Sequence, residues 1–206
     1  MRRAATLLGM LTLAAACNGP DRNRSETGAA SSTATDSAVT TGEVRGDTTM
    51  GNKPKLSDAN IVALLDEANK ADSSAGALAR TKATNPAVKN FAKEMMGEHH
   101  TLRLQGQQLA KQLKVTPEPV ANDPLKPLVE SEMTALKNTP KGAQFDRVYI
   151  EQEISAHKAV LDLADEAHDQ AQNEQLKALI EKAKPVIQKH LDQAEKIQDE
   201  LGKATT

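Results

Sequence analysis

The 206-residue chain has a formal net charge of −2, and 26% of its side chains are charged. It holds two phenylalanines, one tyrosine and no tryptophan. This argues against a β-sandwich or a dinucleotide-binding α/β core, since both need more aromatic and β-branched side chains. The sequence shows no large basic cluster, so we expect no nucleic acid partner. The many alanine, leucine, lysine, glutamate and glutamine residues predict an all-α protein.

The first 17 residues have the pattern of an export signal. Two arginines precede a mostly apolar stretch, 4–16, which is too short to cross a membrane as a helix. It ends at Cys17, the only cysteine, and resembles the lipobox of bacterial lipoproteins, although Leu13 lies four residues before the cysteine where three is usual. We expect lipidation at Cys17, which would attach the protein to the periplasmic side of a membrane, the outer membrane in our prediction. The alternative is cleavage after Ala16, which would leave a free thiol in an oxidising compartment.

The next stretch, 18–55, is rich in Ser, Thr, Gly, Asp and Ala and has almost no apolar residue to bury. It predicts a disordered tether between the lipid and a folded domain, which we place at 56–203.

Capping residues followed by helical apolar periodicity predict four long helices in the folded domain. Their expected starts and ends are Ser57 to about Ala83, Asn85-Pro86 to about Lys114, Thr139-Pro140 to about Gln170, and Asn173 to about Leu201. The last of these contains Pro185, where we expect a kink.

The connection between the second and third helices, 115–138, is much longer than the other two turns. It contains a stripe of apolar residues that predicts a short amphipathic helix. Two tight hairpins joined by one long connection are typical of a ferritin-like four-helix bundle, which is the fold we predict. The stripe consists of Leu125, Leu128, Val129, Met133 and Leu136.

Each long helix has one titratable residue near the middle of its apolar stripe. These are Asp72, His99, His157 and His190. The rise of 1.5 Å per residue places the two members of each hairpin within about one turn of each other, so all four can meet near mid-bundle. The neighbouring His100 lies about 100° round the helix and should be exposed. A second register of the first helix is equally apolar and leaves Asp72 out of the stripe.

Three histidines and a carboxylate in a bundle core suit a divalent transition metal such as zinc, copper, iron or manganese. Glu153 lies one turn before His157 and could orient its ring. The alternative is a polar layer that only fixes the register of the helices, in a non-enzymatic structural or interaction module. Di-iron chemistry is disfavoured, because no Glu-x-x-His pair occurs in the chain. The sequence has no nucleophile-and-base motif or phosphate loop, so we expect no enzymatic activity.

Three sequence blocks resemble the domain of unknown function 4142 family. They are NPAVKNFAKEMMGEH at 85–99, FDRVYI at 145–150 followed by His157, and KAKPVIQKHL at 182–191. The resemblance implies an exported bacterial protein with a ferritin-like bundle, often described as an outer-membrane protein, and implies no reaction. It carries the family's histidines onto His99, His157 and His190 and its acid onto Asp72.

Overall fold

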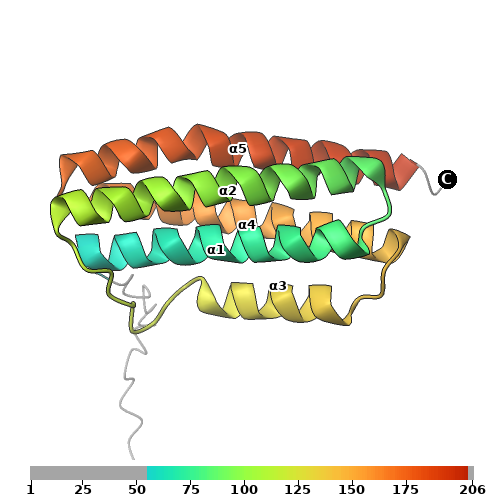
Figure 1. Ribbon diagram of the computed structural model, residues 1–206, viewed down its shortest axis with the longest axis horizontal. Helices are drawn as coiled ribbons and strands as arrows, with labels where there is room; N and C mark the ends of the chain where they lie inside the picture. The colour runs from blue at the N-terminus through green and yellow to red at the C-terminus, as the bar shows by residue number, and fades with distance from the viewer. Residues whose placement is uncertain (1–54, 204–206) are drawn as a thin grey trace, which may run out of the picture. The chain divides into compact units, whose positions relative to one another are not determined.

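A computed structural model describes residues 55–203. The predicted signal peptide with Cys17, and all but the last residue of the predicted tether, lie outside the described residues. The expected all-α fold is confirmed, because within 55–203 the regular structure consists of helices and includes no strand (Figure 1). The helices are α1 (Asp58–Lys82), α2 (Pro86–Leu113), α3 (Lys126–Asn138), α4 (Ala143–Gln170) and α5 (Glu174–Lys203).

The four long helices form two antiparallel hairpins, α1 with α2 and α4 with α5. α1 also packs on α4, and α2 on α5, so the four close into a bundle. The short helix expected in the long connection is present as α3, which lies along the outside of the bundle against α1 and α4 (Figure 1). α3 therefore adds a fifth packing element, which covers one side of the four-helix core.

Side-chain caps begin three of the long helices as the sequence predicts. Ser57 forms a reciprocal capping box with Asn60, with N···O distances of 3.2 and 3.1 Å. Asn85 and Asn173 each accept a hydrogen bond from the amide N–H two residues on, at 2.8 and 2.9 Å. These bonds satisfy amide groups that have no partner inside the helix.

The predicted start of the third long helix at Thr139-Pro140 is wrong. Thr139 is the C-cap of α3, and α4 begins at Ala143. The residue before it, Gly142, has φ of 140°, a backbone conformation that favours glycine. Pro140 therefore lies in the turn between two helices, and the glycine allows the sharp change of direction into α4. α5, by contrast, continues as an α-helix through Pro185.

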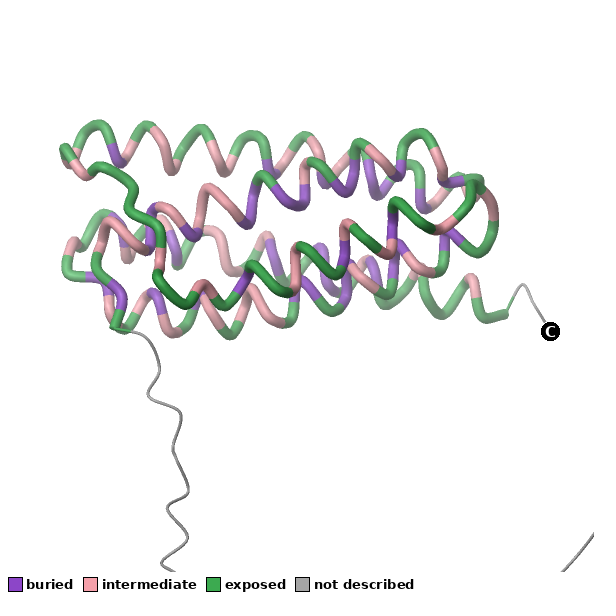
Figure 2. Tube along the Cα trace, turned by 90° about the horizontal axis from the view of Figure 1, so that it is seen from below, coloured by how far each residue is buried: buried purple, intermediate pink, exposed green. Residues whose placement is uncertain are grey.

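The core consists of two apolar clusters, one towards each end of the bundle. All three aromatic residues, Phe91, Phe145 and Tyr149, belong to one cluster, and Ile61 and Leu176 are fully buried members of the other. Figure 2 shows the buried positions along the inner faces of the helices. The predicted polar residues lie between the two clusters in sequence along each helix, so they occupy the middle of the bundle.

The buried carboxylate of Asp146 ties the second hairpin to the first. It accepts hydrogen bonds from the amide N–H groups of Thr84 and Asn85, at 2.8 and 2.9 Å, and from the Thr84 hydroxyl at 2.7 Å. Asp146 stands at the start of α4, whereas its partners form the turn between α1 and α2. These contacts fix the longitudinal position of α4 against the first hairpin.

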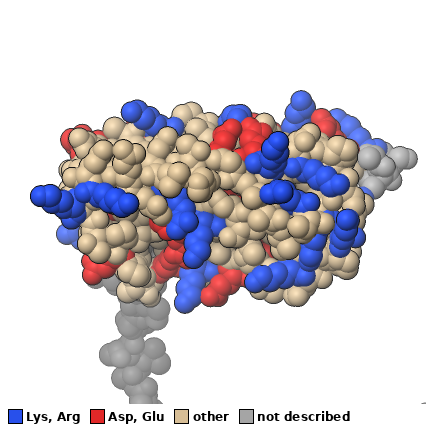
Figure 3. All heavy atoms as spheres, in the orientation of Figure 1, with Lys and Arg blue, Asp and Glu red and all other residues tan. Residues whose placement is uncertain are grey.

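Acidic and basic side chains lie among each other on the face shown in Figure 3. None of the helices in the described part of the chain is long and apolar enough to cross a bilayer.

α1 and α2 approach each other closely at Gly76. A β-carbon on Gly76 would lie 2.8 Å from the backbone oxygen of Ala92 and 3.0 Å from Cγ of Met96. Gly97, also inside a helix, has no atom within 4 Å of the same position. Both glycines lie inside long helices, but only Gly76 is crowded. The same substitution at the two positions therefore compares a crowded site with an open one.

Gly76→Ala should destabilise the protein by about 1–3 kcal/mol, because a backbone atom must move to admit the methyl group. Gly97→Ala should stabilise it by up to about 1 kcal/mol, through helix propensity alone. Urea denaturation of both variants checks this. Equal and favourable changes in the two would show that α1 and α2 are not this close.

Candidate metal centre

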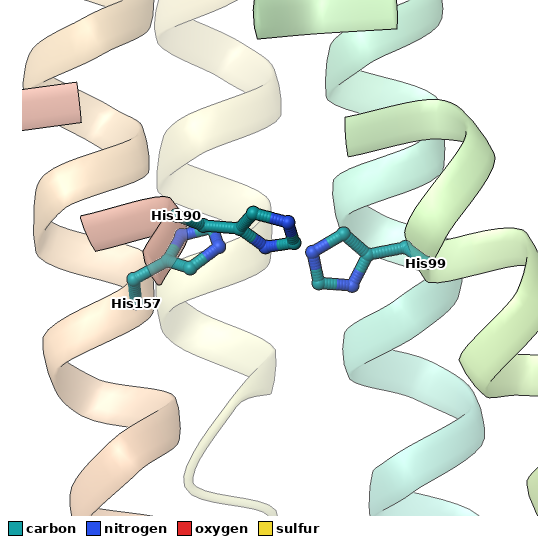
Figure 4. A group of neighbouring side chains, drawn as sticks. All are labelled: His99, His157 and His190. Atoms are coloured by element: carbon teal, nitrogen blue, oxygen red, sulfur yellow. The ribbon is translucent and has the colours of Figure 1, made fainter. Parts of the chain in front are cut away.

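The three predicted histidines meet in the middle of the bundle. His99 comes from α2, His157 from α4 and His190 from α5, and their exposed fractions are 3%, 2% and 0%. Their ring centroids lie 5.1 to 5.7 Å apart. One ring nitrogen from each lies within 4.8 Å of the other two. Figure 4 shows His99 reaching towards the other two rings from the opposite side of the core.

His100, the neighbour of His99, is exposed as the helical geometry predicts. Adjacent histidines on α2 thus point in different directions, one into the core and one to solvent.

Each of the three rings is held through one nitrogen. Nδ1 of His99 lies 3.0 Å from the Asn69 side-chain oxygen. Nδ1 of His157 donates to the backbone oxygen of Glu153 at 2.8 Å. Nε2 of His190 lies 2.9 Å from a carboxylate oxygen of Glu98. Oxygen partners of this kind are those that usually orient a metal-ligating histidine from behind.

The other nitrogen of each ring is buried and has no hydrogen-bond partner. These atoms are Nε2 of His99, Nε2 of His157 and Nδ1 of His190. When the bonded nitrogen carries the proton, the opposite nitrogen has a free lone pair. The three histidines, which form a polar layer, therefore present three nitrogen lone pairs, and none of these has a hydrogen-bond partner. Imidazole ligands bind metal ions through unprotonated nitrogens of this kind.

Burial keeps these histidines neutral. It lowers the pKa of His99 to about 4 and lowers the pKa of His157 and of His190 below the ordinary value of 6.5. A neutral imidazole can bind a metal without first losing a proton. The rings are therefore ready for a metal ion at neutral pH.

Asp72 faces the histidines, and the buried face of α1 is wide enough to include residues of both registers, such as Leu64 and Ala71 of the one that leaves Asp72 out. The residue is 5% exposed, and its Oδ2 lies 3.2 Å from Nδ1 of His99. This is the nitrogen that also contacts Asn69, on the opposite side of the ring from the free Nε2. Asp72 thus supports His99 from behind and stands outside the group formed by the three rings. It belongs instead to a second group, with Glu153 and His157, whose ligand atoms also lie within 4.8 Å of one another.

Sequence reasoning missed two of the supporting residues. Asn69 lies one turn before Asp72 on α1 and is not among the predicted site residues. Glu98 is likewise not among the predicted site residues, but it contacts His190 and accepts from Lys189 at 3.1 Å. Although its partial burial acts in the opposite direction, the bonds from Lys189 and His190 lower the pKa of Glu98. Glu94 and Glu98 stand four residues apart on α2, and Lys189 contacts both. This spacing of two acids was the signal for Glu98 in the sequence.

A third missed residue is Glu132, which reaches the core from α3 and is 2% exposed. It stands three residues after Val129 and four before Leu136, within the apolar stripe of that helix. The signal for its burial in the sequence was an acid at a position of this apolar stripe. Burial, and then the nearby Asp72 charge, raise the pKa of Glu132 to about 8. Burial likewise raises the pKa of Glu153 far above its ordinary range.

These shifts predict that the metal-free protein loses stability as the pH rises from about 6.5 to about 8. The Glu132 carboxyl keeps its proton in the folded state up to its pKa of about 8, whereas the unfolded chain loses it near 4.5. The folded state binds more protons over this window, so raising the pH favours unfolding. The histidines, whose pKa values are lowered, act in the opposite sense only below about pH 6.5.

Urea denaturation with a chelator present should show a loss of about 1–2 kcal/mol across this range. Glu132→Gln should reduce the loss, and Glu130→Gln, an exposed residue of the same helix, should not. A stability independent of pH above 6.5 would contradict the assignment.

Comparison with known proteins adds a family and a fold. The model of the family described as Domain of unknown function (DUF4142) matches residues 45–197. The solved structure described as "CopM in the Cu(II)-bound form" is similar, with a TM-score of 0.55 and 16% sequence identity, over 70% of this chain and 98% of that chain. No curated protein sequence matches. At this identity the likeness to CopM concerns the helical fold alone. Because the family model spans more than half of the chain, the protein belongs to the DUF4142 family.

Proposed function

We propose that the protein binds a copper ion through His99, His157 and His190. The observation that carries the proposal is the set of three buried ring nitrogens, one on each histidine, that have no partner. Neutral imidazole suits copper and zinc, and copper is bound most strongly by most nitrogen sites. The likeness in fold to CopM, a protein described in a copper-bound form, supports copper over zinc.

The alternative is a polar layer that only fixes the register of the helices. Such a layer is stable when its polar atoms are paired with each other. Here the inner nitrogens are unpaired, and each costs about 1–3 kcal/mol if it stays so. A metal ion satisfies all three together, which favours the copper site over the structural layer.

The role we propose is binding without catalysis. The three rings are at most 3% exposed, which favours holding an ion over presenting it to a substrate. Retention of the ion follows from the same burial, because the rings can release it only when the bundle opens.

We further propose that this site works in the cell envelope. The support is the export signal over residues 1–17, the lipobox-like Cys17 and the polar tether over 18–55. A lipid anchor and a tether would hold the bundle on the periplasmic side of the outer membrane. A copper site there would act on ions before they reach the cytoplasm.

Copper should raise the melting temperature of the wild-type protein. At about 100 times the dissociation constant, linkage gives about 2.7 kcal/mol, or roughly 5–10 °C for a domain of this size. His99→Ala should abolish this increment, because one of three ligands is lost. Thermal unfolding followed by circular dichroism, with and without copper, measures it.

His100→Ala is the matched control, since His100 adjoins His99 but is exposed. It should keep the full increment. An equal response of the wild type and both variants to copper would refute the site.

Cys17→Ser should release the protein from the membrane fraction, because the serine cannot take the thioether-linked lipid. Ser25→Ala, in the predicted tether, should leave it there. Cell fractionation with immunoblotting checks both, and unchanged membrane association of Cys17→Ser would contradict the lipid anchor.

A further inference from the structure

A group of polar side chains lies beside His190 at the seam between α2 and α5. Glu94 and Glu98 come from α2, and Lys189 and Gln193 come from α5. The two acidic side chains are 29% and 38% exposed, whereas His190 is fully buried. An oxygen of each acid and a ring nitrogen of His190 all lie within 4.8 Å of one another. The group therefore connects solvent with one ring of the histidine layer.

The residues that hold the other two rings are buried. Asn69 is 9% exposed and Glu153 is 0% exposed. Among these three supporting residues only Glu98 has a partly exposed side chain, and it contacts Nε2 of His190 at 2.9 Å. Nδ1 of the same ring is one of the buried nitrogens without a partner. One imidazole thus belongs both to the buried layer and to the edge of the bundle.

A cationic side chain already lies between the two acids. Nζ of Lys189 is 2.5 Å from Oε1 of Glu94 and 3.1 Å from Oε1 of Glu98. This lysine side chain is 50% exposed and flexible, so its ion pairs are weak and can exchange with an ion from solvent. Gln193 donates to Oε2 of Glu94 at 3.2 Å, but its own side-chain oxygen is buried and has no hydrogen-bond partner. The group therefore holds a positive charge and still has an oxygen atom to offer.

The charge and the position of the group both favour the arrival of a cation. Two carboxylates face a single ammonium group, and an excess of negative charge raises the local concentration of cations. α2 and α5 belong to different hairpins, so their seam can widen without breaking the turn of either hairpin.

We propose that Glu94, Glu98 and Nε2 of His190 form an outer site through which copper(II) enters the histidine layer. The inference rests on the proposed copper function. A mixed set of carboxylate oxygens and an imidazole nitrogen suits copper(II). The arriving ion displaces the ammonium group of Lys189 into solvent and replaces the proton on Nε2, which also leaves to solvent. When the ion moves inward to Nδ1 and the other two rings, Nε2 takes a proton back and donates again to Glu98.

Tyrosine fluorescence reports the arrival of the ion, because copper(II) quenches it and Tyr149 is the only tyrosine in a chain without tryptophan. The ring centroid of Tyr149 is 6.2 Å from that of Phe91, which in turn is 6.5 Å from that of His190. The full-length protein is mixed with copper(II) in a stopped-flow instrument, which gives the loading rate. The final quenching and the rise in melting temperature give the equilibrium response.

Glu94→Gln combined with Glu98→Gln should slow loading at least about tenfold. Glutamine at position 98 can still accept from His190, so the final quenching and the rise in melting temperature should stay as in the wild type. Glu181→Gln combined with Glu195→Gln removes the same charge from exposed positions of α5 and should load as the wild type does. Equal loading rates in the two double variants would overturn the outer site. A lost melting response without slower loading would also overturn it, because the acids would then only position His190.

His99→Ala separates this proposal from the proposed function, since it removes one ligand of the inner site and none of the outer site. We expect this variant to keep weak copper(II) binding through oxygen and nitrogen ligands, measured by electron paramagnetic resonance. Adding Glu94→Gln and Glu98→Gln should abolish that binding. A wild type that binds no copper would refute both sites, whereas binding by His99→Ala that does not need the two acids would refute the outer site alone.

Discussion

The burial of ionisable side chains between two apolar clusters is the constraint on which the rest of the structure depends. A histidine at 0–3% exposure must be neutral, and each of its nitrogens needs a partner that the surrounding helices provide. The bundle provides outer partners for one nitrogen of each ring, from Asn69, the Glu153 backbone and Glu98. The other nitrogen of each ring has no hydrogen-bond partner among the described residues. The close approach of α1 to α2 at Gly76 belongs to the same constraint, since it helps to bring Asn69 and Asp72 within reach of His99.

The elements that depend on local chemistry could be predicted from the sequence. Ser57, Asn85 and Asn173 cap helices because their side chains reach amide groups only two or three residues away. The meeting of His99, His157 and His190 could also be predicted, because helical rise and short turns fix the height of each residue in its hairpin. The start of α4 could not, because Thr139-Pro140 suits a helix start as well as a helix end.

The support of the site depends on packing between elements, which periodicity does not reveal. Glu132 is buried only because α3 folds over α1 and α4. Glu153 was expected to orient His157 by its carboxylate, but the backbone oxygen is the nearer partner, at 2.8 Å against 3.5 Å. Asp72 could be assigned to the layer, yet its position behind the His99 ring depends on how α1 packs against α2. The apolar periodicity of a helix shows which residues face the core, but it does not show which of their atoms are in contact.

The histidines come from different hairpins, His99 from the first and His157 and His190 from the second. An ion held by all three is a cross-link between parts of the chain that are otherwise joined by a long connection, by packing and by polar contacts such as those of Asp146 and Glu98. Such a cross-link acts mostly on the rate at which the hairpins separate, because separation requires the ion to leave first. The bound protein would then resist proteolysis and heat for longer than its equilibrium stability suggests. The lifetime of the folded protein, as much as its affinity for the ion, would depend on the metal.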